Sequence, residues 1–119
     1  MLFRSTSVAI GDASLIGYRT LFDVRTGLNI GKNVAIGAYV SFVDTDHDLG
    51  DPTRRAGRSS SAPITVGDGA RISTGSIVLP GVRIGAGAVV GAGSLVREDC
   101  EPHALYVGRP ARKVRDLPR

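Results

Sequence analysis

One of the two histidines of the chain, His47, lies in a polar segment among three aspartates, Asp44, Asp46 and Asp48. An imidazole titrates close to neutral pH and therefore suits the work of a general base, which takes a proton from an attacking group. A neighbouring carboxylate can orient the ring and stabilise its protonated form, and the spacing does not say which of the three does so. Without further context, a histidine in such a loop is more often solvated or ion-paired, so both interpretations stay open here.

The other histidine and the single cysteine carry weaker signals. His103 lies in the loop after the last repeat, and we assign it no role. Cys100 has no partner for an intrachain disulfide, and the chain shows no charged and apolar leader, so we expect a reducing, cytoplasmic setting. No apolar run approaches the ~20 residues that cross a bilayer, and no contact with a membrane is expected.

Basic residues gather at the C-terminal end of the chain. Between Arg109 and Arg119 there are five of them against Asp116 alone, which matches the formal net charge of +4. Such an end could contact nucleic acid, an anionic membrane or a phosphorylated small molecule. It lacks the interleaved aromatic residues of a single-strand binder and the apolar face of a membrane helix, so no nucleic acid is expected. Two interpretations of this end remain: it binds a phosphorylated small molecule, or it is merely solvated.

The scaffold that must position these groups has a period of six. From residue 64 to residue 96 an aliphatic residue stands at every sixth position: Val66, Ile72, Val78, Ile84, Val90 and Val96. A small or β-branched residue precedes each by two positions: Ile64, Ala70, Ser76, Val82, Ala88 and Ser94. A period of six fits neither a helix nor a single strand, and it predicts a solenoid whose short sides are single hexads. We expect Gly67, Gly85 and Gly91 to allow positive φ at its corners.

The same period runs through the first third of the chain with one interruption. Ile10 and Ile16 begin it, and it slips by two residues between Phe22 and Val24 before it continues to Phe42. Two extra residues can be absorbed as a bulged corner without unstacking the coil. The polar segment 44–63 has no aliphatic repeat, but 24 residues separate Phe42 from Val66, so the solenoid can resume in phase. We therefore interpret this segment as an insertion into a coil.

These patterns predict one all-β domain over residues 1–119. It consists of a first coil block (8–43), an inserted loop (44–63), a second coil block (64–96) and a C-terminal loop with a basic tail (97–119). Aromatic residues make up only 5% of the chain, and tryptophan is absent, so the core must consist of stacked aliphatic side chains. Burying each of them is worth roughly 1.5–3 kcal/mol. So few coils with flat faces would gain from association, and we expect a homotrimer of triangular prisms.

The hexads VGDGAR, ISTGSI, VLPGVR, IGAGAV and VGAGSL resemble those of the hexapeptide-repeat acyltransferases, whose fold is a left-handed parallel β-helix. The loop DTDHDLGDPTRR, the block IVLPGVRIGAGAVVGAGSLV and the ending YVGRPARKVRDL are similar to the sugar O-acetyltransferases of the galactoside, maltose and nodulation type. This resemblance covers the chain from Val8 to Leu117.

The resemblance implies transfer of an acetyl group from acetyl-coenzyme A to a hydroxyl or amine of a small acceptor, either a sugar or a sugar-containing metabolite. It implies sites between the subunits of a trimer, and no metal. His47 matches the general base of the family, and the amide of Thr74 matches the donor that supports the thioester carbonyl. The remaining positions that match coenzyme A contacts are Ala92, Arg97, Arg112 and Arg115.

Three positions depart from the family pattern. Arg71 replaces a tryptophan, Ser73 replaces a glycine, and Gly17 replaces an asparagine that helps to hold the acceptor. Because of these changes an alternative stays open, a non-catalytic trimeric β-helix that acts as a scaffold or binding module and does not bind acetyl-coenzyme A. A carbonic anhydrase of the γ type has the same solenoid, but its zinc needs three histidines and this chain has two.

Overall fold

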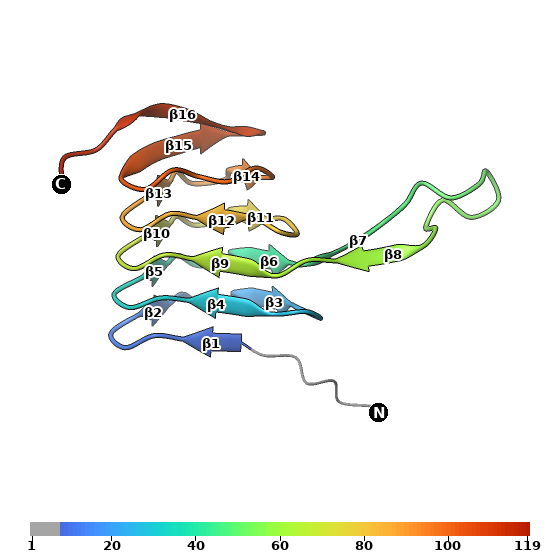
Figure 1. Cartoon of the computed structure of the whole chain (residues 1–119), viewed down its shortest axis with the longest axis horizontal. Helices are drawn as coiled ribbons and strands as arrows, with labels where there is room; N and C mark the ends of the chain where they lie inside the picture. Colours follow the sequence, from blue (N-terminus) through green and yellow to red (C-terminus); the bar gives the residue numbers. More distant parts are fainter. Residues whose placement is uncertain (1–7) are drawn as a thin grey trace.

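A computed structural model describes residues 8–119 as a stack of short strands wound around a prism (Figure 1). The first seven residues of the predicted domain lie outside the described part. Each full coil contributes one strand to each of three sheets. The first two coils contain β1 (Val8–Ile10), β2 (Leu15–Ile16), β3 (Leu21–Asp23), β4 (Leu28–Ile30), β5 (Ala35–Ile36) and β6 (Ser41–Val43).

Two further coils follow the inserted segment. They contain β9 (Ile64–Val66), β10 (Arg71–Ile72), β11 (Ile77–Val78), β12 (Arg83–Ile84), β13 (Val89–Val90) and β14 (Leu95–Val96). Stacking is parallel throughout these coils, in the sheet orders β1-β4-β9-β12, β2-β5-β10-β13 and β3-β6-β11-β14. The chain is therefore a solenoid, as the period of six predicts, and a parallel β-helix, as the family resemblance implies. No helix that could cross a membrane is found among residues 8–119.

The pairing register confirms the predicted slip of two residues. Val66 pairs with Ile84, 18 residues later, which is three hexads. Ile10 instead pairs with Ile30, 20 residues later. The two extra residues widen the corner at 24–27, between β3 and β4. Ile30 pairs with Val66 across 36 residues, so the solenoid resumes in phase after the insertion, as expected.

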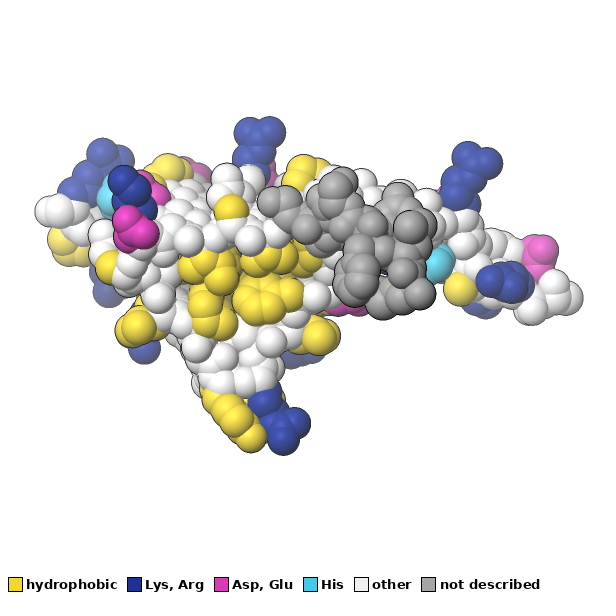
Figure 2. Space-filling view, turned by 90° about the horizontal axis from the view of Figure 1, so that it is seen from below, with side chains coloured by type: hydrophobic (Ala, Val, Ile, Leu, Met, Phe, Trp, Pro, Cys, Tyr) yellow, Lys and Arg dark blue, Asp and Glu magenta, His cyan; other side chains and the backbone are white. Residues whose placement is uncertain are grey.

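Residues at the predicted inward positions of the second block form the core. All twelve are at most 3% exposed, including the serines Ser76 and Ser94. Both serine hydroxyls donate a hydrogen bond to the carbonyl oxygen of Gly91, which satisfies these polar groups inside the coil. At the opposite end, the first coil leaves Val8 and Ile10 exposed, and apolar side chains gather on this face (Figure 2).

The prediction for the corner glycines was wrong in its detail. Positive φ is found two residues after the positions that we expected, at Gly69, Gly87 and Gly93, and also at Gly75 and Gly81. Gly67 and Gly85 are needed because the next coil passes close to them. A Cβ on Gly85 would lie 2.5 Å from the backbone nitrogen of Pro102, and one on Gly67 would clash with the backbone of Ala86.

The inserted segment forms an antiparallel arm. Its strands β7 (Thr45–His47) and β8 (Ser59–Ser61) pair with each other and extend away from the prism (Figure 1). The arm leaves the corner between β6 and β9, so it lies across the prism from the sheet that contains β5 and β10 (Figure 1).

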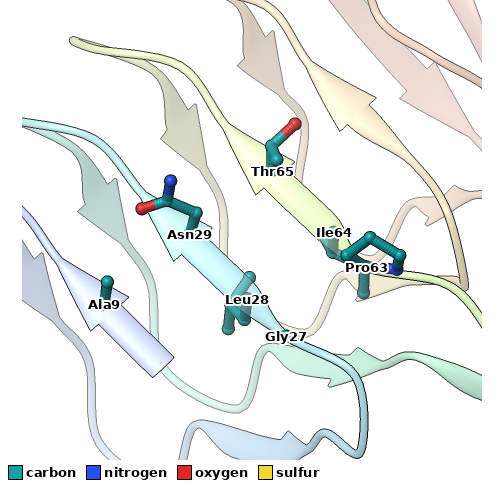
Figure 3. A pocket seen from close by; sticks show the side chains of 7 residues that line it. All are labelled: Ala9, Gly27, Leu28, Asn29, Pro63, Ile64 and Thr65. Carbon is teal, nitrogen blue, oxygen red and sulfur yellow. The ribbon is translucent and has the colours of Figure 1, made fainter. Parts of the chain in front are cut away.

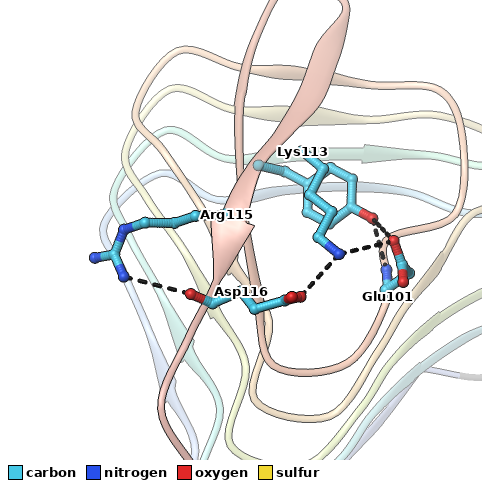
Figure 4. Close-up of polar contacts among 5 residues, drawn as sticks. Glu101, Lys113, Arg115 and Asp116 are labelled. Carbon is cyan, nitrogen blue, oxygen red and sulfur yellow. Dashed lines mark hydrogen bonds and ion pairs between the residues drawn. The ribbon is translucent and has the colours of Figure 1, made fainter.

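The basic tail forms a strand that the sequence analysis did not predict. β15 (Ala104–Gly108) pairs with β13, and β16 (Ala111–Asp116) pairs antiparallel with β15. Lys113 of β16 makes ion pairs with Glu101 at 3.3 Å and Asp116 at 2.8 Å (Figure 4). Charged side chains on the edge strand of a sheet hinder pairing with another chain. Their abundance here therefore fits a protected sheet edge as well as a solvated tail.

Candidate functional site

A backbone carbonyl holds the imidazole of His47. Its Nδ1 lies 3.1 Å from the carbonyl oxygen of Gly57, across the arm. A carbonyl oxygen can only accept a hydrogen bond, so Nδ1 carries the proton in this contact. The lone pair of Nε2 is then available to accept a proton from another group, as a general base requires.

None of the three neighbouring aspartates bonds to this ring among the described residues. The amide of His47 donates to Asp46 Oδ1 at 2.7 Å, which holds the backbone and leaves the ring alone. Asp44 is fully buried and directed to the prism, where its carboxylate accepts the amides of Arg25, Thr26 and Gly27. The carbonyl oxygen of Gly57 therefore orients the imidazole, whereas the sequence suggested that a neighbouring carboxylate would do so.

The pKa of Asp44 reflects its place at the base of the arm. Burial by itself raises the pKa of this carboxyl group. The hydrogen bonds from three backbone amides and from the hydroxyl of Thr45 outweigh burial and hold the pKa below its ordinary value of 3.8. Asp44 is therefore an ionised anchor that ties the start of the arm to the widened corner of the coil.

A hollow lined by hydroxyl groups lies beside the arm. It has a volume of 290 Å³ and is lined by Arg25, Thr45, Ser59, Ser60 and Ser61. Thr45 pairs with Ser61 and His47 pairs with Ser59, and alternate residues of a strand share a face. His47 therefore stands on the same face as three of these hydroxyls. These lining residues could not be predicted from the sequence, because a run of serines in a polar segment has no distinctive signature.

A second hollow, here called the groove, brings two of the predicted residues together. Thr74 and Ala92 both line it, and its volume is 430 Å³. Its other lining residues are Leu15, Ala35, Ile36, Gly37, Arg71, Ile72 and Ser73. Two of the three departures from the family pattern therefore lie in the groove itself. Ser73 causes no backbone strain there, because the positive φ of this corner belongs to Gly75.

Thr74 lies at the corner after β10 and presents a free backbone donor. Its hydroxyl donates to the carbonyl oxygen of Ala38 at 2.7 Å, which fixes the side chain against the preceding coil. Its N–H donates to no acceptor among residues 8–119. An unpaired amide on the wall of a groove can stabilise a developing oxyanion.

The three predicted arginines lie apart from the groove. Arg97 directly follows β14, and Arg112 and Arg115 belong to β16. Arg112 pairs with Glu98 at 3.0 Å, and Arg115 donates to the carbonyl oxygen of Asp116 at 3.4 Å. All three lie toward the C-terminal end of the stack, where they do not line the groove.

A third hollow, on the sheet of β4 and β9, holds none of the predicted residues. It measures 320 Å³ and is lined by small and apolar side chains together with Asn29 and Thr65 (Figure 3). None of its described lining residues carries a titratable group, so they offer neither a general base nor a charged ligand-binding residue.

Comparison with known proteins fits this architecture. A family model described as bacterial transferase hexapeptide (six repeats) matches residues 63–98. The crystal structure of a hexapeptide-repeat acetyltransferase from Vibrio cholerae has a TM-score of 0.88 and 31% sequence identity, and the match covers 96% of this chain and 68% of that one. The chain belongs to the hexapeptide-repeat acetyltransferases. Its fold is the left-handed parallel β-helix that the resemblance implied.

Two further relatives show what the family does elsewhere. The galactoside O-acetyltransferase of Escherichia coli is 37% identical over 98 residues, which are 82% of this chain and 48% of the relative. An N-acyltransferase from Bacillus cereus, solved with coenzyme A and dTDP-4-amino-4,6-dideoxyglucose, has a TM-score of 0.86 and 27% identity, over 96% of this chain and 66% of that one. The chain spans about half the length of the curated relatives that it matches first.

Proposed function

We propose that this protein is an acetyltransferase that moves an acetyl group from acetyl-coenzyme A to a hydroxyl or amine of a small acceptor. The acceptor is a sugar or a sugar-containing metabolite. The observation that carries the proposal is the contact between His47 Nδ1 and the carbonyl oxygen of Gly57, because it leaves Nε2 free to act as a base. The relatives named above, which act on or bind sugars and coenzyme A, support the substrate class.

In the proposed reaction, His47 Nε2 takes the proton of the acceptor as its oxygen or nitrogen attacks the thioester carbonyl carbon. The carbonyl oxygen becomes an oxyanion, which the amide of Thr74 stabilises. The carbon–sulfur bond then breaks, and the leaving thiolate takes the proton from His47, which restores the neutral imidazole. General base catalysis of this kind contributes typically about 10²–10⁴-fold to the rate.

The donor would lie along the groove with its thioester at Thr74 and its thiol arm beside Ala92. Its phosphates would extend toward the C-terminal end of the stack, where Arg97, Arg112 and Arg115 lie. Guanidinium groups suit this task because their forked donors match phosphate oxygens.

A complete site would need a second copy of the chain. The arm that carries His47 lies across the prism from the sheet of β5 and β10 (Figure 1), and residues of these two strands line the groove. His47 of one copy would therefore act at the groove of the next, and three copies would close such a ring. A folded monomer in sedimentation at micromolar concentration would contradict this homotrimer.

The test is acetyl transfer to a panel of sugars and amino sugars, followed by the release of free coenzyme A thiol with a thiol reagent. Burial, and secondarily the charge of Asp99, raise the pKa of Cys100 to about 12, so the protein's own thiol should not react at pH 8. We expect His47→Ala to lower kcat at least 100-fold and the control His103→Ala to keep it. Equal rates for wild type and His47→Ala would remove the proposed base. A wild type that neither transfers acetyl groups nor gains thermal stability from acetyl-coenzyme A would favour the non-catalytic scaffold.

A further inference from the structure

Among the described residues that line the groove, Arg71 is the only charged one. It lies in β10 between Ala35 of β5 and Val89 of β13, its partners in the parallel register. Ile72 points into the core, so the alternation of the strand directs Arg71 outward, on the same face as Ser73. An arginine thus stands on an otherwise uncharged wall close to Thr74.

The guanidinium of Arg71 has no ion-pair or hydrogen-bond partner among residues 8–119. Other basic side chains of the same sheet are paired, Arg112 with Glu98 and Lys113 with Glu101 and Asp116. Within the part of the chain that the structure describes, no carboxylate lines the groove. The five donors of Arg71 are therefore available to a ligand.

We propose that Arg71 binds a carboxylate or phosphate group of a substrate and so makes the enzyme selective for an anionic acyl group or an anionic acceptor. This inference rests on the proposed acyl transfer at Thr74. A guanidinium binds both groups through two parallel hydrogen bonds, which adds orientation to charge attraction.

The position of Arg71 explains why the anion belongs to the reacting groups rather than to the phosphates of coenzyme A. Residues 71 and 74 are separated by at most about 10 Å of chain, so Arg71 lies at the thioester end of the groove. The thiol arm of coenzyme A beside the thioester is uncharged, and its phosphates lie at the far end of the molecule. An anion within reach of Arg71 must therefore come from the acyl group or from the acceptor.

The experiment compares wild type with Arg71→Gln and Arg71→Lys. The control is Arg83→Gln, whose residue occupies the same outward position in β12, on another sheet. Each protein is assayed with acetyl-coenzyme A or succinyl-coenzyme A as donor and with glucosamine or glucosamine 6-phosphate as acceptor. Within each pair, the compound with the added carboxylate or phosphate is here called the charged compound, and the one without that group its neutral counterpart. The readout is the ratio of kcat/KM for the charged compound to that for its neutral counterpart.

We expect wild type and Arg83→Gln to prefer one charged compound, and Arg71→Gln to lower that ratio about 10- to 100-fold. Arg71→Lys should retain part of the preference, since it keeps the charge and loses the fork. A preference for succinyl-coenzyme A identifies the acyl group as the source of the anion, and a preference for glucosamine 6-phosphate identifies the acceptor. A ratio that Arg71→Gln leaves unchanged overturns the proposal.

A second measurement separates this inference from the proposed function. If no combination of substrates turns over, the proposed reaction fails, and the same four compounds are tested as ligands through the melting temperature. The charged compound should then stabilise the wild type more than its neutral counterpart does, and Arg71→Gln should abolish this difference. That result supports an anion-binding site at Arg71 without the proposed reaction. No difference between charged and neutral compounds overturns it.

Discussion

Thr26 donates its backbone N–H to Asp44 Oδ2 at 2.6 Å, a contact that joins the widened corner of the coil to the base of the arm. The two residues that interrupt the period of six thus have a structural use. They form the corner whose amides, from Arg25 to Gly27, converge on one buried carboxylate. The carbonyl oxygen of Asp44 also accepts the amide of Ala62, so this residue holds both strands of the arm at its root.

Asp44→Asn should therefore destabilise the fold. It replaces an acceptor of amide hydrogen bonds by a group that can turn N–H donors toward those same amides. We expect a loss of about 2 kcal/mol in the free energy of unfolding, measured by urea denaturation. Asp48→Asn is the matched control, because Asp48 is exposed and should change stability by less than about 0.5 kcal/mol. A smaller loss of unfolding free energy for Asp44→Asn than for the control would contradict the role of Asp44 as an anchor of the arm.

The contribution of Asp44 should also depend on pH in a defined direction. Its pKa is lowered in the folded state, so it stabilises the fold above the ordinary value of 3.8 and loses this contribution as the pH falls through the folded pKa. The difference in unfolding free energy between wild type and Asp44→Asn should accordingly shrink below about pH 4. Urea titrations at pH 6 and pH 3 measure this difference, and a gap that widens in acid would be inconsistent with a lowered pKa.

Gly57→Ala should impair His47 without damaging the coil. A Cβ at residue 57 would lie 2.9 Å from the backbone of Gly50, so the tip of the arm must shift and move the carbonyl that holds the imidazole. We expect kcat to fall about 10-fold or more, with KM for acetyl-coenzyme A and the melting temperature nearly unchanged. Ala56→Ser alters the neighbouring exposed position and should be neutral. A loss of kcat in both variants would point to general damage of the arm.

Most of the scaffold follows from sequence, because a coil can bury its sides only if an aliphatic residue returns every sixth position. The same constraint revealed the slip between Phe22 and Val24, since a one-residue shift would turn side chains outward. Pairing within the arm and along β16 could not be predicted in this way. Both segments are mostly exposed, so neither face needs to be apolar and the alternation that marks a half-buried strand is absent.

The site was predictable only where side chains define it. The family resemblance predicted roles for His47 and Thr74, and the structure adds the backbone groups around them. The carbonyl of Gly57 has no signature in the sequence, because every residue carries a carbonyl and only the fold decides which one faces the imidazole. The separation of the arm from the groove is likewise a property of the prism. No spacing between His47 and Thr74 along the chain reveals it.

Two glycines of one corner offer a direct test of why each is needed. Gly67→Ala places a methyl group against the backbone of Ala86 and forces adjacent coils apart. Gly69→Ala adds a methyl group in open space and costs only the strain of its positive φ of 72°, about 1–2 kcal/mol. We expect Gly67→Ala to lower the free energy of unfolding more than Gly69→Ala does. A larger loss for Gly69→Ala would mean that positive φ, and not the close approach of the next coil, is the main reason for glycine at this corner.

The charges of β16 should divide into structural and ligand-binding groups. Lys113 has two carboxylate partners, whereas the only contact found for the guanidinium of Arg115 among the described residues is a long one to a backbone carbonyl. Arg115→Gln should therefore weaken the binding of acetyl-coenzyme A by about 10-fold and reduce its sensitivity to salt, because a phosphate contact is lost. Lys113→Gln should leave affinity unchanged and should alter stability little, as expected for exposed ion pairs. Titration calorimetry at two salt concentrations decides between them, and equal losses of affinity would assign the effect to overall charge rather than to a site at Arg115.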